Sequence, residues 1–237
     1  MNCDFTFKHY NAILTIAKNV GYRFGNFKES RQGPVLILRH DVDFSPRNAL
    51  RFGTLEAEKG VRSTYFFLLR TPFYNLLEYN VVSVLRQLRK LGHEIGLHFD
   101  QQAVRVVDRR VLEAEVLYEL SVVSRILGEE VKVVSFHNPL NNVFCWNAAS
   151  FTNAYAASFF LKEMKYLSDS NHQWREGCLC RLLKERKYDR IQVLIHPELW
   201  DTRPGNVVER LTKAVNDSRL ACQGYLEERN DVFKKRK

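Results

Sequence analysis

Short apolar runs alternate with segments of helical periodicity along this chain. Residues 34–40 (PVLILRH) form a continuous apolar run that suits a strand buried on both faces. Further strands are expected at 63–69, 93–98, 132–138, 164–169 and 190–196. Because helices of roughly 10 to 20 residues separate these runs, the pattern predicts an α/β fold with a parallel sheet, either closed as a barrel or doubly wound.

The expected helices are marked by their caps and stops. Ser45 and Pro46 are typical of a helix start, and a helix over about 46–59 ends before Gly60. A second helix is expected to end at Gly92. The clearest helix begins at Asp108 and ends at Gly128, with one apolar face made by Leu112, Val116, Leu120, Val123 and Leu127.

Length and hydropathy indicate an ordinary globular protein. The chain has 237 residues, 45% of them hydrophobic, which is enough for a sizeable core, and we expect one domain over residues 1–237. No apolar stretch approaches the roughly 20 residues that cross a bilayer, and residues 1–10 lack the pattern of a signal peptide. These features predict a cytoplasmic protein without a transmembrane segment.

Charge and cysteine content narrow the class of partner. The formal charge is +9, but the basic residues are scattered and no nucleic-acid-binding motif accompanies them, so no nucleic-acid partner is expected. Such charge also suits an acidic glycan or a sugar nucleotide. The five cysteines are odd in number and lack paired CxxC spacing, which indicates reduced thiols. Nothing in the sequence indicates the oligomeric state.

Histidine or aspartate stands at the carboxyl end of five expected strands. The residues are Asp41 and Asp43, His98, His137, Asp169 and His196. A single polar residue at such a place commonly caps a turn. Five together favour a metal site with adjacent acid and base groups, because reactive groups in parallel α/β folds gather at this edge of the sheet.

The spacing of Asp41 and Asp43 allows the two carboxylates to have different roles. Side chains alternate along a strand, so both carboxylates can project to one side while Val42 packs into the sheet. One carboxylate can then bind a cation while the other takes a proton from the water that the cation activates.

Six ordered segments of the chain resemble the motifs of a known family. They are RHDVDFSP, GVRSTYFFL, GHEIGLH, SFHNP, SDSNHQW and LIHPE. They resemble those of the polysaccharide deacetylases, the NodB-homology carbohydrate esterases, and in particular the HDVD branch found in surface-polysaccharide biosynthesis. The resemblance covers about residues 34–200 and implies a distorted (β/α) barrel of about seven parallel strands.

The same resemblance implies an activity and a cofactor. The family removes an N-acyl group, usually N-acetyl, from a sugar in a metal-dependent hydrolysis. Zinc is the first expectation for the metal, with cobalt, manganese and nickel as alternatives. The implied partner is an N-acylated sugar within a glycan, a lipid-linked sugar or a nucleotide-linked sugar, and O-antigen biosynthesis is the expected context.

Roles are implied for the matching positions. Asp41 matches the general base, Asp43 the carboxylate ligand, His98 the first histidine ligand and His196 the general acid. Asp169 and Trp174 match the fourth motif, in which the acidic residue tunes the histidine acid and the indole lines the pocket. Trp200 and Tyr74 are expected near the site as sugar-stacking aromatics.

Two positions depart from the family pattern. Gln102 stands where the second histidine ligand is usual, four residues after His98, and an amide is a poorer ligand for zinc-like cations. His137 stands where the family commonly has an arginine that orients the base. We therefore expect His137 to supply the missing imidazole, with Asp100 as the competing third ligand.

The missing histidine leaves two alternatives open. One is a catalytically inactive pseudoenzyme that binds carbohydrate without a metal. The other is an enzyme of the same fold that hydrolyses a different C–N amide bond. Metal content separates the first alternative from the enzymes, and a substrate panel separates the enzymes from each other.

Overall fold

A computed structural model describes residues 3–27, 33–105, 108–160 and 163–234. Eight strands form one sheet, and every strand pairing is parallel. The strands are β1 (Arg23–Gly25), β2 (Val35–Val42), β3 (Thr64–Leu68), β4 (Glu94–Asp100), β5 (Val133–His137), β6 (Thr152–Asn153), β7 (Lys165–Ser168) and β8 (Arg190–Ile195). Each strand predicted from the sequence is present, with ends that differ by at most two residues.

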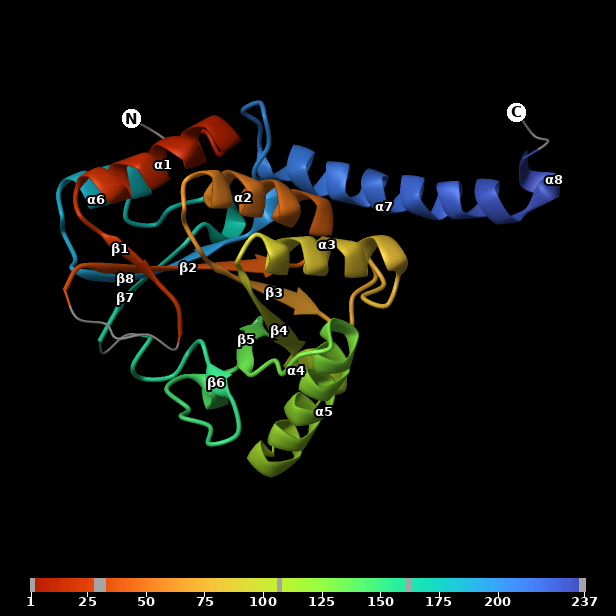
Figure 1. The fold of residues 1–237 in the computed structure, drawn as a ribbon, viewed down its shortest axis with the longest axis horizontal. Coiled ribbons are helices and arrows are strands. Elements are labelled where there is room, and N and C mark those ends of the chain that lie inside the picture. Colours follow the sequence, from red (N-terminus) through yellow and green to blue (C-terminus); the bar gives the residue numbers. More distant parts are fainter. Residues whose placement is uncertain (1–2, 28–32, 106–107, 161–162, 235–237) are drawn as a thin grey trace.

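The sheet curls without closing. Seven strands follow the order β6-β5-β4-β3-β2-β8-β7, and β1 pairs with the first part of β2 (Figure 1). Within the described ranges, no pairing joins β6 to β7. The predicted distorted (β/α) barrel of about seven parallel strands is therefore confirmed as an incomplete barrel.

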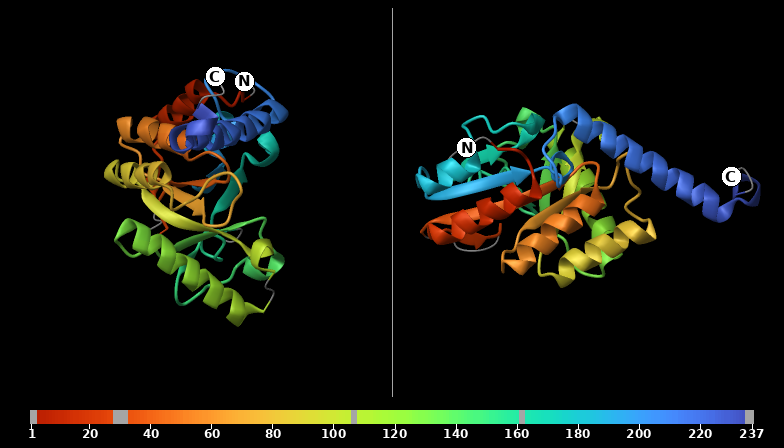
Figure 2. Two further views of the ribbon diagram at one scale, coloured as in Figure 1. Left: turned by 90° about the vertical axis from the view of Figure 1, so that its right-hand side faces the viewer. Right: turned by 90° about the horizontal axis from the view of Figure 1, so that it is seen from above.

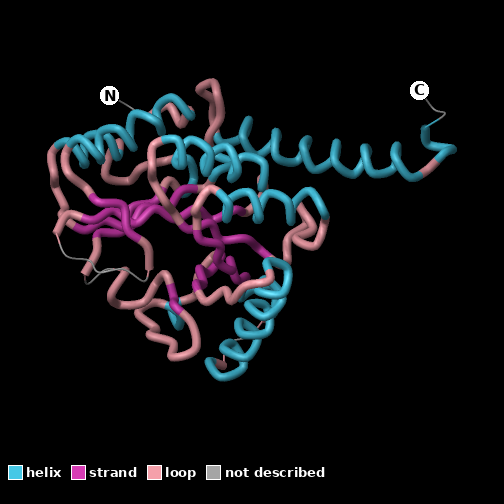
Figure 3. Tube along the Cα trace, viewed as in Figure 1, coloured by secondary structure: helices cyan, strands magenta, loops and turns pink. Residues whose placement is uncertain are grey.

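Helices cover the outer side of this sheet. They are α1 (Phe7–Asn19), α2 (Pro46–Glu58), α3 (Tyr79–Lys90), α4 (Gln101–Val104), α5 (Arg109–Leu127), α6 (Leu179–Lys184), α7 (Val207–Arg229) and α8 (Asp231–Lys234). Three 3₁₀ turns lie at η1 (Asn141–Val143), η2 (Ser170–His172) and η3 (Pro197–Leu199). As Figure 3 shows, much of the chain on the side of the strands away from α1, α2 and α3 is irregular.

The predicted caps are confirmed for two helices. The Ser45 side chain accepts from the backbone N–H of Asn48 at the start of α2, and Asp108 accepts from Arg110 and Val111 at the start of α5. The last long helix, α7, extends beyond the body of the fold (Figure 2). Of the helices in the described ranges, none has the length and apolar character that a bilayer crossing requires.

The two faces of β2 contact two different cores. Leu36, Leu38 and Val42 belong to the large core between the sheet and the outer helices. Val35 and Ile37 point to the inside of the curl. There they join a smaller apolar cluster with Phe27, Phe66, Val133, Ala154, Ala156, Phe159 and Met164. Because side chains alternate, Arg39 and Asp41 continue this inner row toward the carboxyl end of the strand.

Gly96 allows the inner side of the barrel to pack closely. A Cβ atom at this position of β4 would lie 2.5 Å from the Phe66 ring and 2.9 Å from the carbonyl oxygen of Val133. Both distances are shorter than a non-bonded carbon contact allows. Gly96, the second glycine of the GHEIGLH motif, is thus required for β4 to lie against β3 and β5. His98 lies on this strand.

The outer face of β2 carries a buried polar network centred on Glu56 of α2. The His40 Nε2 atom lies 2.7 Å from Glu56 Oε1, which also accepts from the Tyr10 hydroxyl. The hydroxyls of Ser63 and Tyr65 donate to Glu56 Oε2 at 2.5 and 2.7 Å. Burial opposes ionisation of this carboxyl, but His40 outweighs burial and lowers the pKa of Glu56 to about 2.

This network predicts a specific loss of stability in acid. The pKa of Glu56 is lower in the folded than in the unfolded chain, so its contribution is present above the unfolded value of about 4.5 and is lost as the pH falls toward 2. That difference corresponds to about 3 kcal/mol. We expect Glu56→Gln to reduce the free energy of unfolding at pH 7 by about this amount and to flatten its dependence on pH below 4.5.

Urea denaturation between pH 7 and pH 3 measures this effect. Glu58→Gln, on the exposed side of the same helix, makes the same change of charge and is the matched control. Equal pH dependence in the two variants would contradict the role given to Glu56.

Candidate active site

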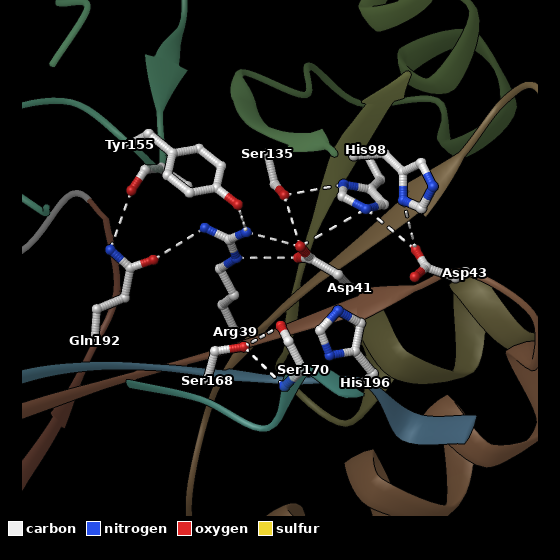
Figure 4. A network of polar contacts seen from close by, with 12 residues as sticks. Arg39, Asp41, Asp43, His98, Ser135, Tyr155, Ser168, Ser170, Gln192 and His196 are labelled. Carbon is white, nitrogen blue, oxygen red and sulfur yellow. Dashed lines mark hydrogen bonds and ion pairs between the residues drawn. The ribbon is translucent and has the colours of Figure 1, made fainter. Parts of the chain in front are cut away.

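Arg39 and Asp41 form a fully buried ion pair on the inner face of β2. The Arg39 Nε and Nη2 atoms donate to Asp41 Oδ1 and Oδ2 at 3.0 and 2.7 Å, a bidentate arrangement (Figure 4). Arg39 also donates to the Tyr155 hydroxyl at 2.7 Å and to Gln192 Oε1 at 3.1 Å. Burial disfavours the carboxylate, but Arg39 outweighs it and holds the pKa of Asp41 below its usual range.

The role of Arg39 is absent from the sequence predictions. The family resemblance places an orienting arginine after β5, where this chain has His137, whereas the structure has Arg39 two residues before Asp41 on the same strand. A signal was present in the sequence. Arg39 follows the apolar run PVLIL and stands two residues before Asp41. Its side chain can therefore face the same side of the strand as that carboxylate.

Ser135 links Asp41 to His98 and fixes the imidazole. The Ser135 hydroxyl lies 3.0 Å from Asp41 Oδ2 and 2.9 Å from His98 Nδ1. An ionised carboxylate can only accept, so the single hydroxyl proton is donated to Asp41 and the serine oxygen accepts from His98 Nδ1–H. In the neutral imidazole with its proton on Nδ1, the Nε2 atom of His98 is the nitrogen available as a metal ligand.

Three ligating side chains converge beside this link. Asp43 Oδ1 lies 3.2 Å from His98 Nε2 and 3.4 Å from His137 Nδ1, and the ligand atoms of the three residues all lie within 4.8 Å of one another. Apart from these two nitrogens, the buried Asp43 Oδ1 has no polar partner among the described residues. A carboxylate oxygen and imidazole nitrogens at such distances share either a proton or a metal ion, and the set fits a divalent metal.

The pKa shifts of Asp43 and His137 agree with this close grouping of ligand atoms. Burial disfavours the Asp43 carboxylate, but its contacts with His137 and His98 hold the pKa of Asp43 well below the usual range. Burial likewise disfavours the imidazolium of His137, and Asp43 outweighs it and raises the pKa of His137. A metal ion at this position would therefore compete with a proton.

The two other residues considered as ligands point elsewhere. Asp100 is the N-cap of α4, and its Oδ1 accepts from the backbone N–H groups of Gln102 and Ala103 at 2.9 and 3.2 Å. The exposed side chain of Gln102 is directed toward the carbonyl oxygen of Asn138, at 3.5 Å. Neither side chain belongs to the group formed by Asp43, His98 and His137.

His196 stands across the pocket from this group and is held by Asp169. The Asp169 Oδ1 atom lies 2.7 Å from His196 Nδ1, and its Oδ2 accepts from the Trp200 indole N–H at 2.7 Å. The backbone N–H of His196 also contacts both carboxylate oxygens. Burial disfavours the imidazolium, but Asp169 outweighs it and raises the pKa of His196 to about 10.

The aromatic residues expected to stack on sugar have other positions. Trp200 is completely buried, so it is not accessible to a ligand, and its role is to orient Asp169. The Tyr74 hydroxyl donates to the carbonyl oxygen of Val42 at 2.7 Å and accepts from the backbone N–H of Leu68, which ties the loop after β3 to β2. Trp174 does line the pocket, although it is itself 7% exposed.

The pocket has a volume of about 370 Å³ and opens at the carboxyl ends of the strands. Asp41, Asp43, His98, His137 and His196 all line it. Six aromatic residues also line it, and the rest of the lining includes the charged residues Arg175 and Glu176. The aromatic residues are Phe136, Phe144, Tyr155, Phe160, Tyr166 and Trp174. The pocket thus combines an apolar wall with a few convergent polar groups, as small-molecule sites commonly do.

No family model and no curated protein matches the sequence. Among solved structures, the fold is similar to the Xyl-CE4 domain of a multidomain xylanase from the hindgut metagenome of Trinervitermes trinervoides, with 15% identity, a TM-score of 0.47, and 79% of this chain and 84% of that chain covered. It is similar to the chitin deacetylase of the fungal pathogen Colletotrichum lindemuthianum, with 15% identity, a TM-score of 0.46 and the same coverage.

A CE4 family pseudoenzyme from Bacillus anthracis is matched at 12% identity with a TM-score of 0.46, over 81% of this chain and 63% of that chain. These matched structures are thus proteins of the family 4 carbohydrate esterases, which include deacetylases and a pseudoenzyme. The chemistry of this site is derived below from the chain's own residues.

The geometry predicts which substitutions remove a metal ion. We expect His137→Ala and Asp43→Ala each to lower the zinc content of the purified protein by close to one equivalent per chain, because each loses a ligand. Asp100→Ala is the control and should keep the wild-type content, since its carboxylate caps α4. Plasma mass spectrometry of the three variants measures this, and a loss confined to Asp100→Ala would contradict the ligand set.

Proposed function

We propose that this protein is a metal-dependent hydrolase that removes an N-acyl group, in the simplest case N-acetyl, from a sugar. The proposal rests on one observation. A side chain that is held ionised and one that is held protonated lie around one set of metal ligands. Asp41 is held ionised by Arg39, and His196 is held protonated by Asp169, while Asp43, His98 and His137 lie in the same pocket.

The ligand set suits zinc, and cobalt, manganese or nickel would fit the same two imidazoles and carboxylate. A divalent metal held there supplies Lewis acidity, which polarises an amide carbonyl and lowers the pKa of water. The fit rests on the buried Asp43 Oδ1, whose polar partners in the described structure are the two imidazole nitrogens.

Asp41 and His196 divide the proton transfers of amide hydrolysis between them. Because its pKa is low, Asp41 remains a carboxylate at neutral pH and can accept a proton from the attacking water. His196 has a pKa of about 10, so it is an imidazolium at neutral pH and can donate to the departing nitrogen. The amine then leaves in its protonated form, which is a far better leaving group than an amide anion.

The aromatic wall favours a sugar as the group that carries the amide. Phe144, Tyr155, Phe160 and Tyr166 line the same pocket as the ligand set. Such a wall can contact the C–H face of a pyranose while the metal-facing side receives the acylamido substituent. Assignment to surface-polysaccharide or O-antigen biosynthesis rests on the HDVD motif, which resembles that branch of the family.

The alternative of a metal-free pseudoenzyme was motivated by Gln102 at the usual ligand position. His137 offers an imidazole nitrogen 3.4 Å from Asp43, which supports it as the third ligand in place of a histidine at 102. Hydrolysis of a different C–N amide uses the same proton transfers, and a substrate panel that adds non-sugar amides separates it from sugar deacetylation.

Turnover should depend on both proton-transfer residues. We expect Asp41→Asn and His196→Gln each to lower kcat by about 10²- to 10⁴-fold with little change in KM, because each loses a proton acceptor or donor. Acetate release from N-acetylated oligosaccharides, nucleotide-linked N-acetyl sugars and lipid-linked N-acetyl sugars measures the effect.

Folding must be checked in the same variants, because Asp41→Asn leaves Arg39 buried without its counter-ion. The melting temperature and metal content identify any variant that has lost structure, and His196→Gln leaves that ion pair intact. Wild-type turnover in a folded His196→Gln variant would refute the assigned acid. Sugar binding without acetate release from any member of the panel would favour the pseudoenzyme.

The pairing of Asp169 with His196 predicts a shift in the pH profile. Asp169→Asn removes the negative charge that raises the pKa of His196, so the imidazolium should be lost at lower pH. We expect the basic limb of the kcat/KM profile to move downward by at least about one pH unit. Asp189→Asn, which removes an exposed carboxylate next to β8, is the control, and an unmoved limb in Asp169→Asn would contradict the assignment.

A further inference from the structure

A second group of metal-binding side chains lies outside the proposed active site, where α1 meets α6. Cys178 and Cys180 come from the start of α6, and His9 comes from the first turn of α1. Cys3 lies in the segment that precedes α1, and its sulfur, the His9 nitrogen and the Cys178 sulfur all lie within 4.8 Å of one another. His9, Cys178 and Cys180 are buried, and Cys3 is partly buried.

The contacts within this group have the dimensions of a tetrahedral site. His9 Nε2 lies 3.1 Å from the Cys178 sulfur and 3.4 Å from the Cys180 sulfur. With metal–sulfur bonds of about 2.3 Å and metal–nitrogen bonds of about 2.0 Å, tetrahedral angles place nitrogen and sulfur roughly 3.5 Å apart. Cys180 contacts His9 but lies outside the group of three residues whose ligand atoms are all within 4.8 Å of one another. Three ligands are therefore already in place, and movement of the Cys180 sulfur toward the other two sulfurs would complete four around one ion.

The far side of His9 carries the partner that such a ligand usually has. Asp4 Oδ1 lies 3.7 Å from His9 Nδ1, the ring nitrogen that does not face the sulfurs. The same oxygen accepts from the backbone N–H and the hydroxyl of Thr6, at 3.0 and 2.8 Å. A carboxylate beside Nδ1 favours the tautomer in which Nε2 is free to bind a metal.

We propose that Cys3, His9, Cys178 and Cys180 form a structural site for a thiophilic divalent ion, with zinc as the ion that a Cys₃His set selects. All four positions of a tetrahedral ion are filled by protein, which leaves none for water or substrate. The site is distinct from the proposed active site, whose ligands are one carboxylate and two imidazoles.

The position of this group indicates what the ion stabilises. The residues just before Cys178, from Trp174 to Gly177, line the pocket. Phe5, between Cys3 and α1, stacks on Trp174 with ring centroids 6.5 Å apart and planes 9° from parallel. An ion bound by Cys3, His9, Cys178 and Cys180 would thus fix the segment before α1 against one wall of the pocket.

Cobalt substitution tests the proposal without any variant. The metal-free protein, kept reduced, is titrated with Co²⁺, and we expect a thiolate-to-cobalt charge-transfer band in the near ultraviolet that saturates within two equivalents, because the proposed active site also takes up Co²⁺. The active-site ligands are oxygen and nitrogen, so they do not produce this band. His98→Ala should retain the band, and Cys178→Ser should lose most of it.

Thiol counting gives a second measurement on the same samples. Zinc should protect three of the five cysteines from a thiol reagent, and a chelator should expose them again. Cys222→Ser, which removes an exposed thiol of α7, is the matched control and should leave the zinc content unchanged.

Three outcomes would overturn the proposal. They are a wild-type protein that develops no charge-transfer band with excess Co²⁺, a band that persists undiminished in folded Cys178→Ser, and a disulfide between Cys3 and Cys178 in protein prepared with zinc under reducing conditions. None of these outcomes bears on the hydrolase, since His98→Ala and Cys178→Ser affect separate ligand sets.

Discussion

The buried pair of Arg39 and Asp41 is the interaction on which the rest of the site depends. Two charges this deep are tolerable only because each is fully hydrogen bonded, and removal of either would leave the other buried and uncompensated. Ser135 connects Asp41 to His98 by two hydrogen bonds and thereby fixes the tautomer of His98. Arg39 is connected to Gln192, whose amide donates to the carbonyl oxygens of Ala154 and Phe159, next to the pocket-lining residues Tyr155 and Phe160.

The alternation of β2 explains how one strand contributes both to the proposed active site and to stability. Odd-numbered positions face the inside of the curl, where the apolar side chains of Val35 and Ile37 give way to Arg39 and Asp41. His40, between the two charged residues, faces α2 and pairs with Glu56 instead. The two polar networks therefore lie on opposite faces of the sheet, separated by the backbone, and each has its own set of partners.

The strands and the central helices were predictable because their signals are local. Apolar runs, the caps Ser45 and Asp108, and the stop at Gly128 are each contained in a few residues, and the structure has them where expected. No element was predicted before residue 34 or after 196. Only Arg210 and Ala214 of α7 are buried, so that helix has little apolar pattern to detect, and its start depends on the capping box of Asn206 and Glu209.

The site was predictable where the motif resemblance named a residue and not where folding brought distant residues together. Arg39 was overlooked because its family counterpart follows a different strand. The grouping of Cys3 with Cys178 and Cys180 was overlooked because spacing along the chain carries no information on contacts between α1 and α6. The interpretation of all five cysteines as simple reduced thiols followed from that spacing alone.

The position of His137 follows from the register of two neighbouring strands. His98 of β4 pairs with Ser135 of β5, so a residue two positions further along β5 returns to the same face, closer to the pocket. Its ring lies 5.3 Å from that of His98, nearly perpendicular to it. A ligand four residues after His98 would instead have to come from α4, where the side chain of Gln102 is exposed. A strand end is the more rigid support for a ligand, and the serine that fixes His98 and the histidine that completes the set are then delivered by one strand.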